Sequence, residues 1–140
     1  MAVRKASAVW NGGLRGGNGN FKTETGLGGA YSFTSRFENG AGSNPEELLG
    51  AAQAACFSMA LGGDLEKNGT PATTIETSAA VTAERVSEKW TVTKIALTTR
   101  ATVPNIDKAT FERIANGTKE NCPVSRALKA VNIELTATLT

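Results

Sequence analysis

The sequence predicts an α+β protein whose sheet is mostly antiparallel, and three observations lead to this expectation. The expected elements follow the order strands, helix, strands, helices, strand, which is typical of the α+β class. Residues 44–67 carry the strongest helix signal, and residues 131–140 alternate polar and apolar side chains with a strict period of two. With 140 residues, 40% hydrophobic and 20% charged, we expect one globular domain, residues 1–140, with its own core.

The N-terminal part of the sequence predicts an antiparallel meander. Residues 3–10 form the first expected strand and residues 21–25 the second. In residues 31–37 aromatic side chains alternate with polar ones, which predicts a third strand. The glycine-rich turn at residues 12–19 lacks the lysine and the following helix that a phosphate-binding loop needs, so we do not assign it that role.

The helix expected over residues 44–67 has clear signals at both ends. Asn44 suits the N-cap, Pro45 suits the first helical position, and Asn68-Gly69 is a typical stop. Between residues 48 and 61 the helix is apolar on nearly every face. We therefore expect it to be packed on more than one side.

The second half of the sequence predicts two long strands, residues 74–86 and 90–103, joined by a polar turn. The apolar phase shifts between Val92 and Ile95, and a β-bulge at that point would explain the shift. A helix capped by Asp107 and a short helix starting near Cys122 precede the final strand.

Charge and hydropathy exclude several classes of partner. The 15 basic and 13 acidic residues give a net charge of +2 and are interspersed, which predicts neither nucleic-acid binding nor a membrane-binding patch. The N-terminus lacks the apolar segment of a signal peptide, and we expect no segment long enough to span a bilayer. The expected location is the cytoplasm, where thiols are kept reduced.

The chain contains two cysteines, Cys56 and Cys122, and no histidine. Without histidine, a Ser-His-Asp triad, a Cys-His pair and imidazole metal ligands are excluded. Two cysteines alone, with no histidine, make a weak zinc site. Thiol chemistry is the first candidate, because two thiols can cycle between dithiol and disulfide.

Local sequence leaves the roles of the two thiols open. Both could be inert, since a free cysteine often behaves as a small buried hydrophobe. Burial in the apolar helix would raise the pKa of Cys56 and make it a poor nucleophile. Cys122 precedes Pro123 and would be the N-cap of a helix, where the dipole stabilises a thiolate, although the motif could be only a helix start.

A reactive Cys56 needs a positive partner or directed hydrogen bonds, and the candidates for the positive partner are Arg36 and Arg15. An arginine can orient a carboxylate while it stabilises a thiolate, but spacing alone favours Arg36 as an ordinary surface arginine. Arg36 is expected in the strand over residues 31–37, and Arg15 in the glycine-rich turn.

Three motifs resemble one known family. They are NPEELLGAAQAACFSMA at residues 44–60, CPVS at residues 122–125 and SRFE at residues 35–38. Together they are similar to the OsmC/organic hydroperoxide resistance family, in its osmotically inducible branch, and the similarity runs essentially from end to end. The resemblance implies an OsmC-like α+β fold in which antiparallel sheets enclose central helices, and an intertwined homodimer with two active sites at the subunit interface.

The resemblance also implies a thiol-dependent peroxidase that reduces organic hydroperoxides, and hydrogen peroxide less well. Carried onto this chain, Cys56 is the peroxidatic cysteine and Cys122 the resolving cysteine, which overrules the local argument for Cys122 as the reactive thiol. Arg36 and Glu46 are the pair that activates the thiolate, and Arg15 is the second choice. An external dithiol, in the family a lipoylated protein, restores both thiols, and no metal or bound organic cofactor is required. A redox sensor and a dimer that binds a hydrophobic ligand are the competing interpretations.

Helix geometry adds one expectation. Glu46 and Cys56 are ten residues apart on one expected helix. In a straight helix they lie about 15 Å apart and about 80° out of phase, so they cannot share a site. Either the helix bends sharply near Gly50, or Glu46 reaches Cys56 of a second subunit. We favour the second subunit and expect an inactive monomer.

Overall fold

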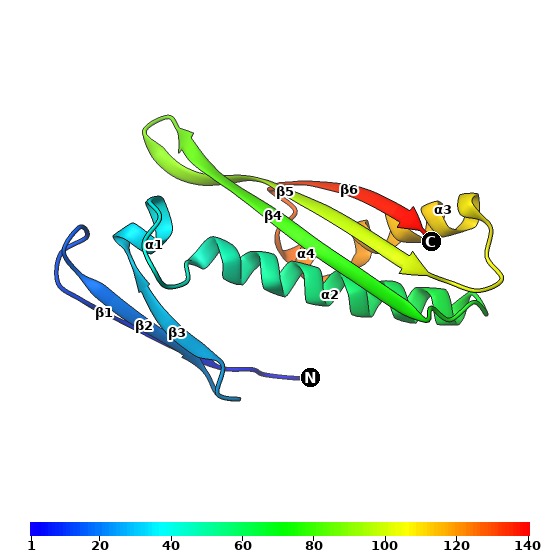
Figure 1. The fold of residues 1–140 in the computed structure, drawn as a ribbon, viewed down its shortest axis with the longest axis horizontal. Coiled ribbons are helices and arrows are strands. Elements are labelled where there is room, and N and C mark those ends of the chain that lie inside the picture. Colours follow the sequence, from blue (N-terminus) through cyan, green and yellow to red (C-terminus); the bar gives the residue numbers. More distant parts are fainter. The chain divides into compact units, whose positions relative to one another are not determined.

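The structure is a computed structural model that describes residues 1–140, and the chain divides into two units, Met1–Leu48 and Leu49–Thr140. The expectation of a single domain remains a prediction. In the first unit, strands β1 (Ala6–Asn11), β2 (Asn18–Thr23) and β3 (Gly28–Ser32) form an antiparallel sheet in the order β1-β2-β3, as expected (Figure 1).

The segment that follows β3 corrects the sequence analysis. Residues 33–37 form a short helix, α1 (Phe33–Phe37), where a strand was expected, so Arg36 lies on a helix. The physical reason is a capping box: Ser32 Oγ accepts a hydrogen bond from the Ser35 amide at 3.1 Å, and Ser35 Oγ accepts one from the Ser32 amide at 2.9 Å.

Helix α2 (Pro45–Lys67) has the predicted bounds and begins in the first unit. Its N-cap is Asn44, whose Oδ1 accepts a hydrogen bond from the Glu47 amide at 2.9 Å. The helix runs without interruption through Gly50, and a Cβ at Gly50 would come within 3.4 Å of the Ala79 carbonyl oxygen. Glycine therefore allows β4 to approach α2 closely.

The second unit contains a mixed sheet in the order β4-β5-β6. Strands β4 (Thr74–Val86) and β5 (Lys89–Thr102) are antiparallel, and their register shifts at Thr93, which confirms the predicted bulge. Strand β6 (Asn132–Leu139) pairs with β5 in parallel, contrary to the expected antiparallel sheets. The parallel pairing is possible because helices α3 (Lys108–Asn121) and α4 (Pro123–Ala127) form a crossover between β5 and β6.

The buried hydrophobic core lies in the second unit. It contains Phe57, Leu61 and Leu65 of α2 together with apolar side chains of β5 and α3. Figure 1 shows this part of α2 running beside the β4–β5–β6 sheet.

Another face of α2 is apolar and is not covered by the second unit. Ala52 and Ala55 are exposed, and Met59 is 78% exposed. Within the second unit α2 packs on one side, and packing on a further side remains a prediction.

Helix α2 is also long and apolar enough, judged by length and composition alone, to cross a membrane. The expectation that no segment reaches that length is therefore wrong for α2. The core helix of a globular protein passes the same test, and Phe57, Leu61 and Leu65 place one face of α2 in the core. The absence of membrane binding remains a prediction.

Candidate active site

The two cysteines lie side by side in the second unit. Cys56 comes from the middle of α2, and Cys122 caps the N-terminus of α4. Their sulfur atoms are 3.0 Å apart, with the Cys122 thiol donating a hydrogen bond to Cys56 Sγ. Both are free thiols; Cys122 is buried and Cys56 is partly exposed. A disulfide needs sulfur atoms about 2.05 Å apart, so a small movement would join them.

The surroundings of the two thiols shift their pKa values in opposite directions. Burial raises the pKa of Cys56, and the hydrogen bond and charge of Cys122 raise it further, against a lowering effect of the Val124 amide. Burial also acts to raise the pKa of Cys122, but hydrogen bonding outweighs it and holds the pKa below its usual value. The largest lowering cause is the contact with Cys56, followed by the polar groups of Ser125 and Val124 at the start of α4.

Gln53 is the site residue that the sequence analysis passed over. It lies one helical turn before Cys56, is fully buried, and its Nε2 donates a hydrogen bond to Ser125 Oγ at 2.7 Å. Its Oε1 is the one buried side-chain polar atom without a hydrogen-bond partner. A glutamine in an otherwise apolar helix was the available signal, but its partner lies 72 residues away in the sequence.

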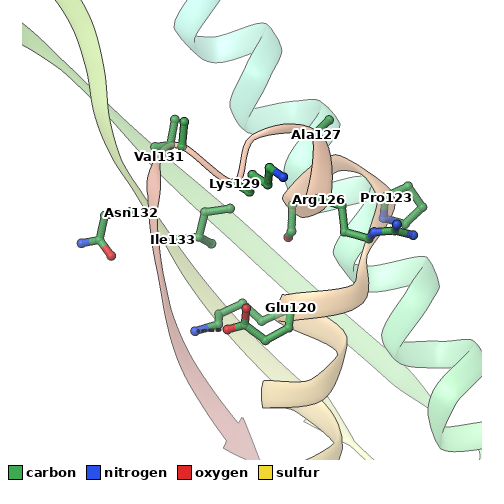
Figure 2. Close-up of a pocket in the computed structure, with 11 residues that line it drawn as sticks. Glu120, Pro123, Arg126, Ala127, Lys129, Val131, Asn132 and Ile133 are labelled. Atoms are coloured by element: carbon green, nitrogen blue, oxygen red, sulfur yellow. Dashed lines mark ion pairs between the residues drawn. The ribbon is translucent and has the colours of Figure 1, made fainter.

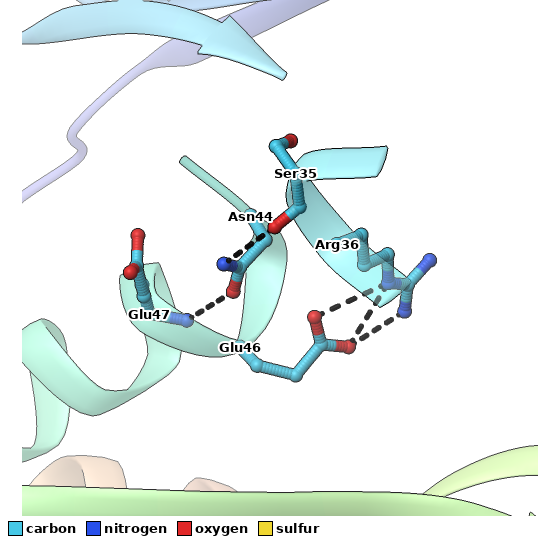
Figure 3. A network of polar contacts seen from close by, with 5 residues as sticks. All are labelled: Ser35, Arg36, Asn44, Glu46 and Glu47. Atoms are coloured by element: carbon cyan, nitrogen blue, oxygen red, sulfur yellow. Dashed lines mark hydrogen bonds and ion pairs between the residues drawn. The ribbon is translucent and has the colours of Figure 1, made fainter. Parts of the chain in front are cut away.

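Arg36 and Glu46 form an ion pair in the first unit (Figure 3). Arg36 Nη2 lies 2.7 Å from Glu46 Oε1, and Arg36 Nε lies 3.2 Å from both carboxylate oxygens. This is the bidentate contact that an arginine fork makes with a carboxylate. The Arg36 side chain is 36% exposed and that of Glu46 is 14% exposed, so the guanidinium has surface left for another anion.

Each of the two candidate arginines lies over an aromatic ring. The Arg36 guanidinium lies 5.0 Å from the centre of the Phe37 ring, and the guanidinium of Arg15 lies 4.9 Å from the centre of the Phe33 ring. A pocket of about 280 Å³ opens beside them. It is lined by Trp10, Leu14, Tyr31, Ser32, Phe33, Arg36, Phe37 and Pro45.

The structure brings the predicted residues together as two pairs. Cys56 meets Cys122 within the second unit, and Arg36 meets Glu46 within the first. No arginine is among the groups that shift the pKa of Cys56.

No three side chains of the types that commonly bind metals are grouped together in the chain. Two thiolates supply only half of a structural zinc site. The absence of a metal and of an organic cofactor remains a prediction.

A groove of about 840 Å³ lies along α4 and the start of β6 (Figure 2). The cationic side chains in its lining are Lys119, Arg126 and Lys129, and Glu120 pairs with Lys119 at 3.0 Å. The groove also reaches Ser125, the buried partner of Gln53.

Two thiols in contact, on helices that belong to different parts of the chain, define a dithiol site capable of reversible disulfide formation. A family model described as OsmC-like protein matches residues 38–136. The protein belongs to the OsmC family.

Relatives and solved structures agree with this assignment. The chain is 46% identical over 129 residues to Peroxiredoxin OsmC of Escherichia coli, covering 91% of this chain and 90% of that protein. The fold matches an OsmC-like protein of Vibrio cholerae with a TM-score of 0.77 at 16% identity, over 98% of this chain and 99% of the other. It also matches an organic hydroperoxide resistance protein OsmC of Legionella pneumophila with a TM-score of 0.70 at 22% identity, over 100% and 99% of the two chains.

Proposed function

We propose that this protein is a cysteine-based peroxidase that reduces organic hydroperoxides, and hydrogen peroxide more weakly, to alcohols or water. The contact between Cys56 and Cys122 at 3.0 Å is the observation that carries the proposal, because it prepares a disulfide without a large rearrangement. The name of the Escherichia coli relative, Peroxiredoxin OsmC, supports the same activity.

The first step consumes the peroxide. The Cys56 thiolate attacks the terminal oxygen of the hydroperoxide, an S–O bond forms, and the O–O bond breaks. The departing alkoxide takes up a proton and leaves as an alcohol, while Cys56 becomes a sulfenic acid. In the second step the Cys122 thiolate attacks the sulfenic sulfur. A disulfide forms and hydroxide leaves as water after it gains a proton.

Cys56 needs a cation for the first step, since burial and Cys122 raise its pKa. Arg36 is the proposed cation: it favours the thiolate and orients the peroxide, and Glu46 holds it through the bidentate pair. Arg15 is the second choice.

The cation is proposed to come from a second copy of the chain. Helix α2 is continuous from Pro45 to Lys67. Glu46 and Cys56 of one such helix are too far apart along it to share a site. An intertwined homodimer would also cover the exposed apolar face of α2 around Met59. We expect activity to fall when the protein is diluted until monomers dominate, measured by initial rates across a dilution series. A fully active monomer would contradict this arrangement.

The pocket beside Arg36 supports an organic hydroperoxide as the substrate. Its lining is mostly aromatic and apolar, which suits the organic group of a hydroperoxide better than a second water-like oxygen. An external dithiol then reduces the disulfide by two exchange steps, and a lipoylated protein is the proposed donor.

The test is steady-state consumption of cumene hydroperoxide with a dithiol donor, compared for the wild type and Cys56→Ser. We expect turnover by the wild type, slower turnover with hydrogen peroxide, and none in the variant. A redox sensor would oxidise once and then stall, and a ligand-binding protein would show no turnover in either form. Either of these results would overturn the proposal.

A further inference from the structure

A buried polar contact joins α2 to α4 beside the cysteine pair. Gln53 lies one helical turn before Cys56 on α2, and Ser125 lies in the first turn of α4, just after Cys122. Gln53 Nε2 is 2.7 Å from Ser125 Oγ, and the two sulfur atoms are 3.0 Å apart. Two side-chain contacts, about one helical turn apart, therefore connect the same two segments of the chain.

Gln53 occupies a position at which α2 otherwise carries apolar side chains. The core side chains of α2 are Phe57, Leu61 and Leu65, and Gln53 continues their spacing of four toward the N-terminus. Gln53 is fully buried, and its Oε1 has no hydrogen-bond partner. Burying an amide with one unpaired atom is less favourable than burying an apolar side chain of similar volume. Packing alone does not explain this glutamine, whereas a directed contact with Ser125 does.

Helix α4 relies on this contact more than α3 relies on any single one. Helix α3 places Phe111, Ile114 and Ala115 in the hydrophobic core. Helix α4 has five residues, and Ser125 is its one buried residue. A helix this short is held in place by its tertiary contacts. Because Cys122 is both the C-cap of α3 and the N-cap of α4, the place of α4 affects the place of the Cys122 thiol.

We propose that Gln53 is a positioning residue that holds α4 against α2 through its hydrogen bond to Ser125. The contact keeps Cys122 within reach of Cys56. This rests on the proposed function, in which the Cys122 thiolate attacks the Cys56 sulfenic acid: the S–S bond forms, the S–O bond breaks, and hydroxide leaves as water after it gains a proton. A thiol held in place reacts faster than a mobile one, because folding has already paid the entropy of bringing the two sulfur atoms together.

The first measurement is the dithiol–disulfide equilibrium of the two cysteines in dithiothreitol buffers, which needs no peroxide. Gln53→Met keeps the approximate side-chain volume and removes the amide. A less firmly held Cys122 lowers the effective concentration of the thiol pair. We therefore expect the equilibrium to move about three- to tenfold toward the dithiol, equivalent to a potential up to about 30 mV higher. An unchanged equilibrium would overturn the proposal.

The second measurement separates positioning from a loss of reactivity at Cys56. After addition of cumene hydroperoxide, the Cys56 sulfenic acid either closes to the disulfide or is trapped by dimedone. We expect Gln53→Met to slow closure about three- to tenfold and to raise the trapped fraction, while sulfenic acid forms at the wild-type rate. Slower formation with unchanged closure would place Gln53 at the peroxide step and contradict the proposal.

A double variant and a matched control distinguish this contact from general loosening of α2. Ser125→Ala should resemble Gln53→Met, and the double variant should lose no more than the larger single loss, because both changes break the same hydrogen bond. Ser58→Ala removes another part-buried hydrogen bond of α2, from Ser58 Oγ to Thr77 Oγ1 at 2.8 Å, and should leave the equilibrium unchanged.

Additive losses in the double variant, or an equal loss in Ser58→Ala, would overturn the positioning role. A protein that does not react with hydroperoxides would refute the proposed function instead, and the equilibrium in dithiothreitol would still report on Gln53.

Discussion

The two units of the chain differ in what they bury and in the chemistry they carry. The second unit, Leu49–Thr140, contains the whole buried hydrophobic core and both thiols. The first unit, Met1–Leu48, contains the Arg36–Glu46 pair and leaves Val9, Leu14 and Leu27 each at least 60% exposed.

Each unit therefore has a requirement that its own side chains do not meet. The first unit rests on a three-stranded sheet and on ring contacts such as Trp10–Tyr31, with centroids 5.4 Å apart, and such a sheet needs an apolar face packed against something. The second unit contains the Cys56 thiol, whose pKa is raised by burial and by Cys122, and no cation is among the groups that shift this pKa. A second copy of the chain would meet both needs, as the proposed homodimer requires.

The largest expected effect is on peroxide turnover, and it concerns the two thiols of the second unit. In Cys122→Ser the sulfenic acid of Cys56 has no resolving thiol, so we expect a burst of about one equivalent of alcohol per subunit and then a stall. Product release from cumene hydroperoxide and trapping of the sulfenic acid with dimedone measure this. Cys56→Ser, the matched control, should show no burst. Undiminished steady-state turnover in Cys122→Ser would remove Cys122 from the mechanism.

The next largest effect is on kcat/KM, and it concerns Arg36 in the first unit. Arg36→Met should lower kcat/KM about 10²- to 10³-fold, because a preorganised charge is lost. The loss should be greatest at low pH and partly recovered at high pH, because without the cation the pKa of Cys56 lies higher and a thiolate forms only at higher pH. Arg15→Met should cost less. The reverse order in a pH–rate series would assign the activating role to Arg15.

A smaller effect compares one substitution in both units. Leu65 is fully buried in the core, and Leu27 is 65% exposed in the first unit. Leu65→Ala should lower the free energy of unfolding by about 2–5 kcal/mol, and Leu27→Ala by about 0.5 kcal/mol or less. Urea denaturation measures both. A large loss of unfolding free energy in Leu27→Ala would show that this side chain is covered in the assembly. The two units would then not differ in burial at these two leucines.

The smallest expected effect is on thermal stability, and it is tested by comparing two helix caps. Asp107 caps α3 by accepting hydrogen bonds from the hydroxyl and amide of Thr110, which hold the pKa of Asp107 below its usual 3.8. Because the folded-state pKa is lowered, the stabilisation is present above pH 3.8 and is lost as the pH falls through the lowered value.

Asp107→Ala should therefore lower Tm by a few degrees at neutral pH, and the difference from the wild type should shrink in acid. Asn44→Ala, which removes the uncharged cap of α2, is the control and should show a difference that does not change with pH. Identical acid profiles for the two variants would mean that the charge of Asp107 contributes nothing.

Local signals in the sequence predicted much of the fold, and contacts between distant residues escaped prediction. The caps at Asn44 and Asp107 and the bulge beside Val92 depend on neighbouring residues, and the structure confirms all three. Phe33 and Phe37 fit a strand face, but a spacing of four also fits one face of a helix, and the Ser32–Ser35 capping box decides for the helix.

The residues of the candidate site also divide into those that sequence motifs identified and those whose contacts depend on the fold. The motifs pointed to Cys56 and Cys122, and the structure places these two side chains in contact. Gln53 could not be assigned, because its meaning depends on Ser125, which only the folding of α4 against α2 brings within 2.7 Å. The parallel pairing of β5 with β6 was missed for a similar reason, since it depends on the path of the chain through α3 and α4.

The most direct measurement is complementation between two inactive variants, Cys56→Ser and Arg36→Met, unfolded together and refolded as mixed dimers. If Arg36 of one subunit activates Cys56 of the other, each mixed dimer contains one intact site, and a 1:1 mixture should recover about a quarter of wild-type peroxidase activity. Mixed dimers that form, as shown by native mass spectrometry, but stay as inactive as the two parents would contradict the shared site.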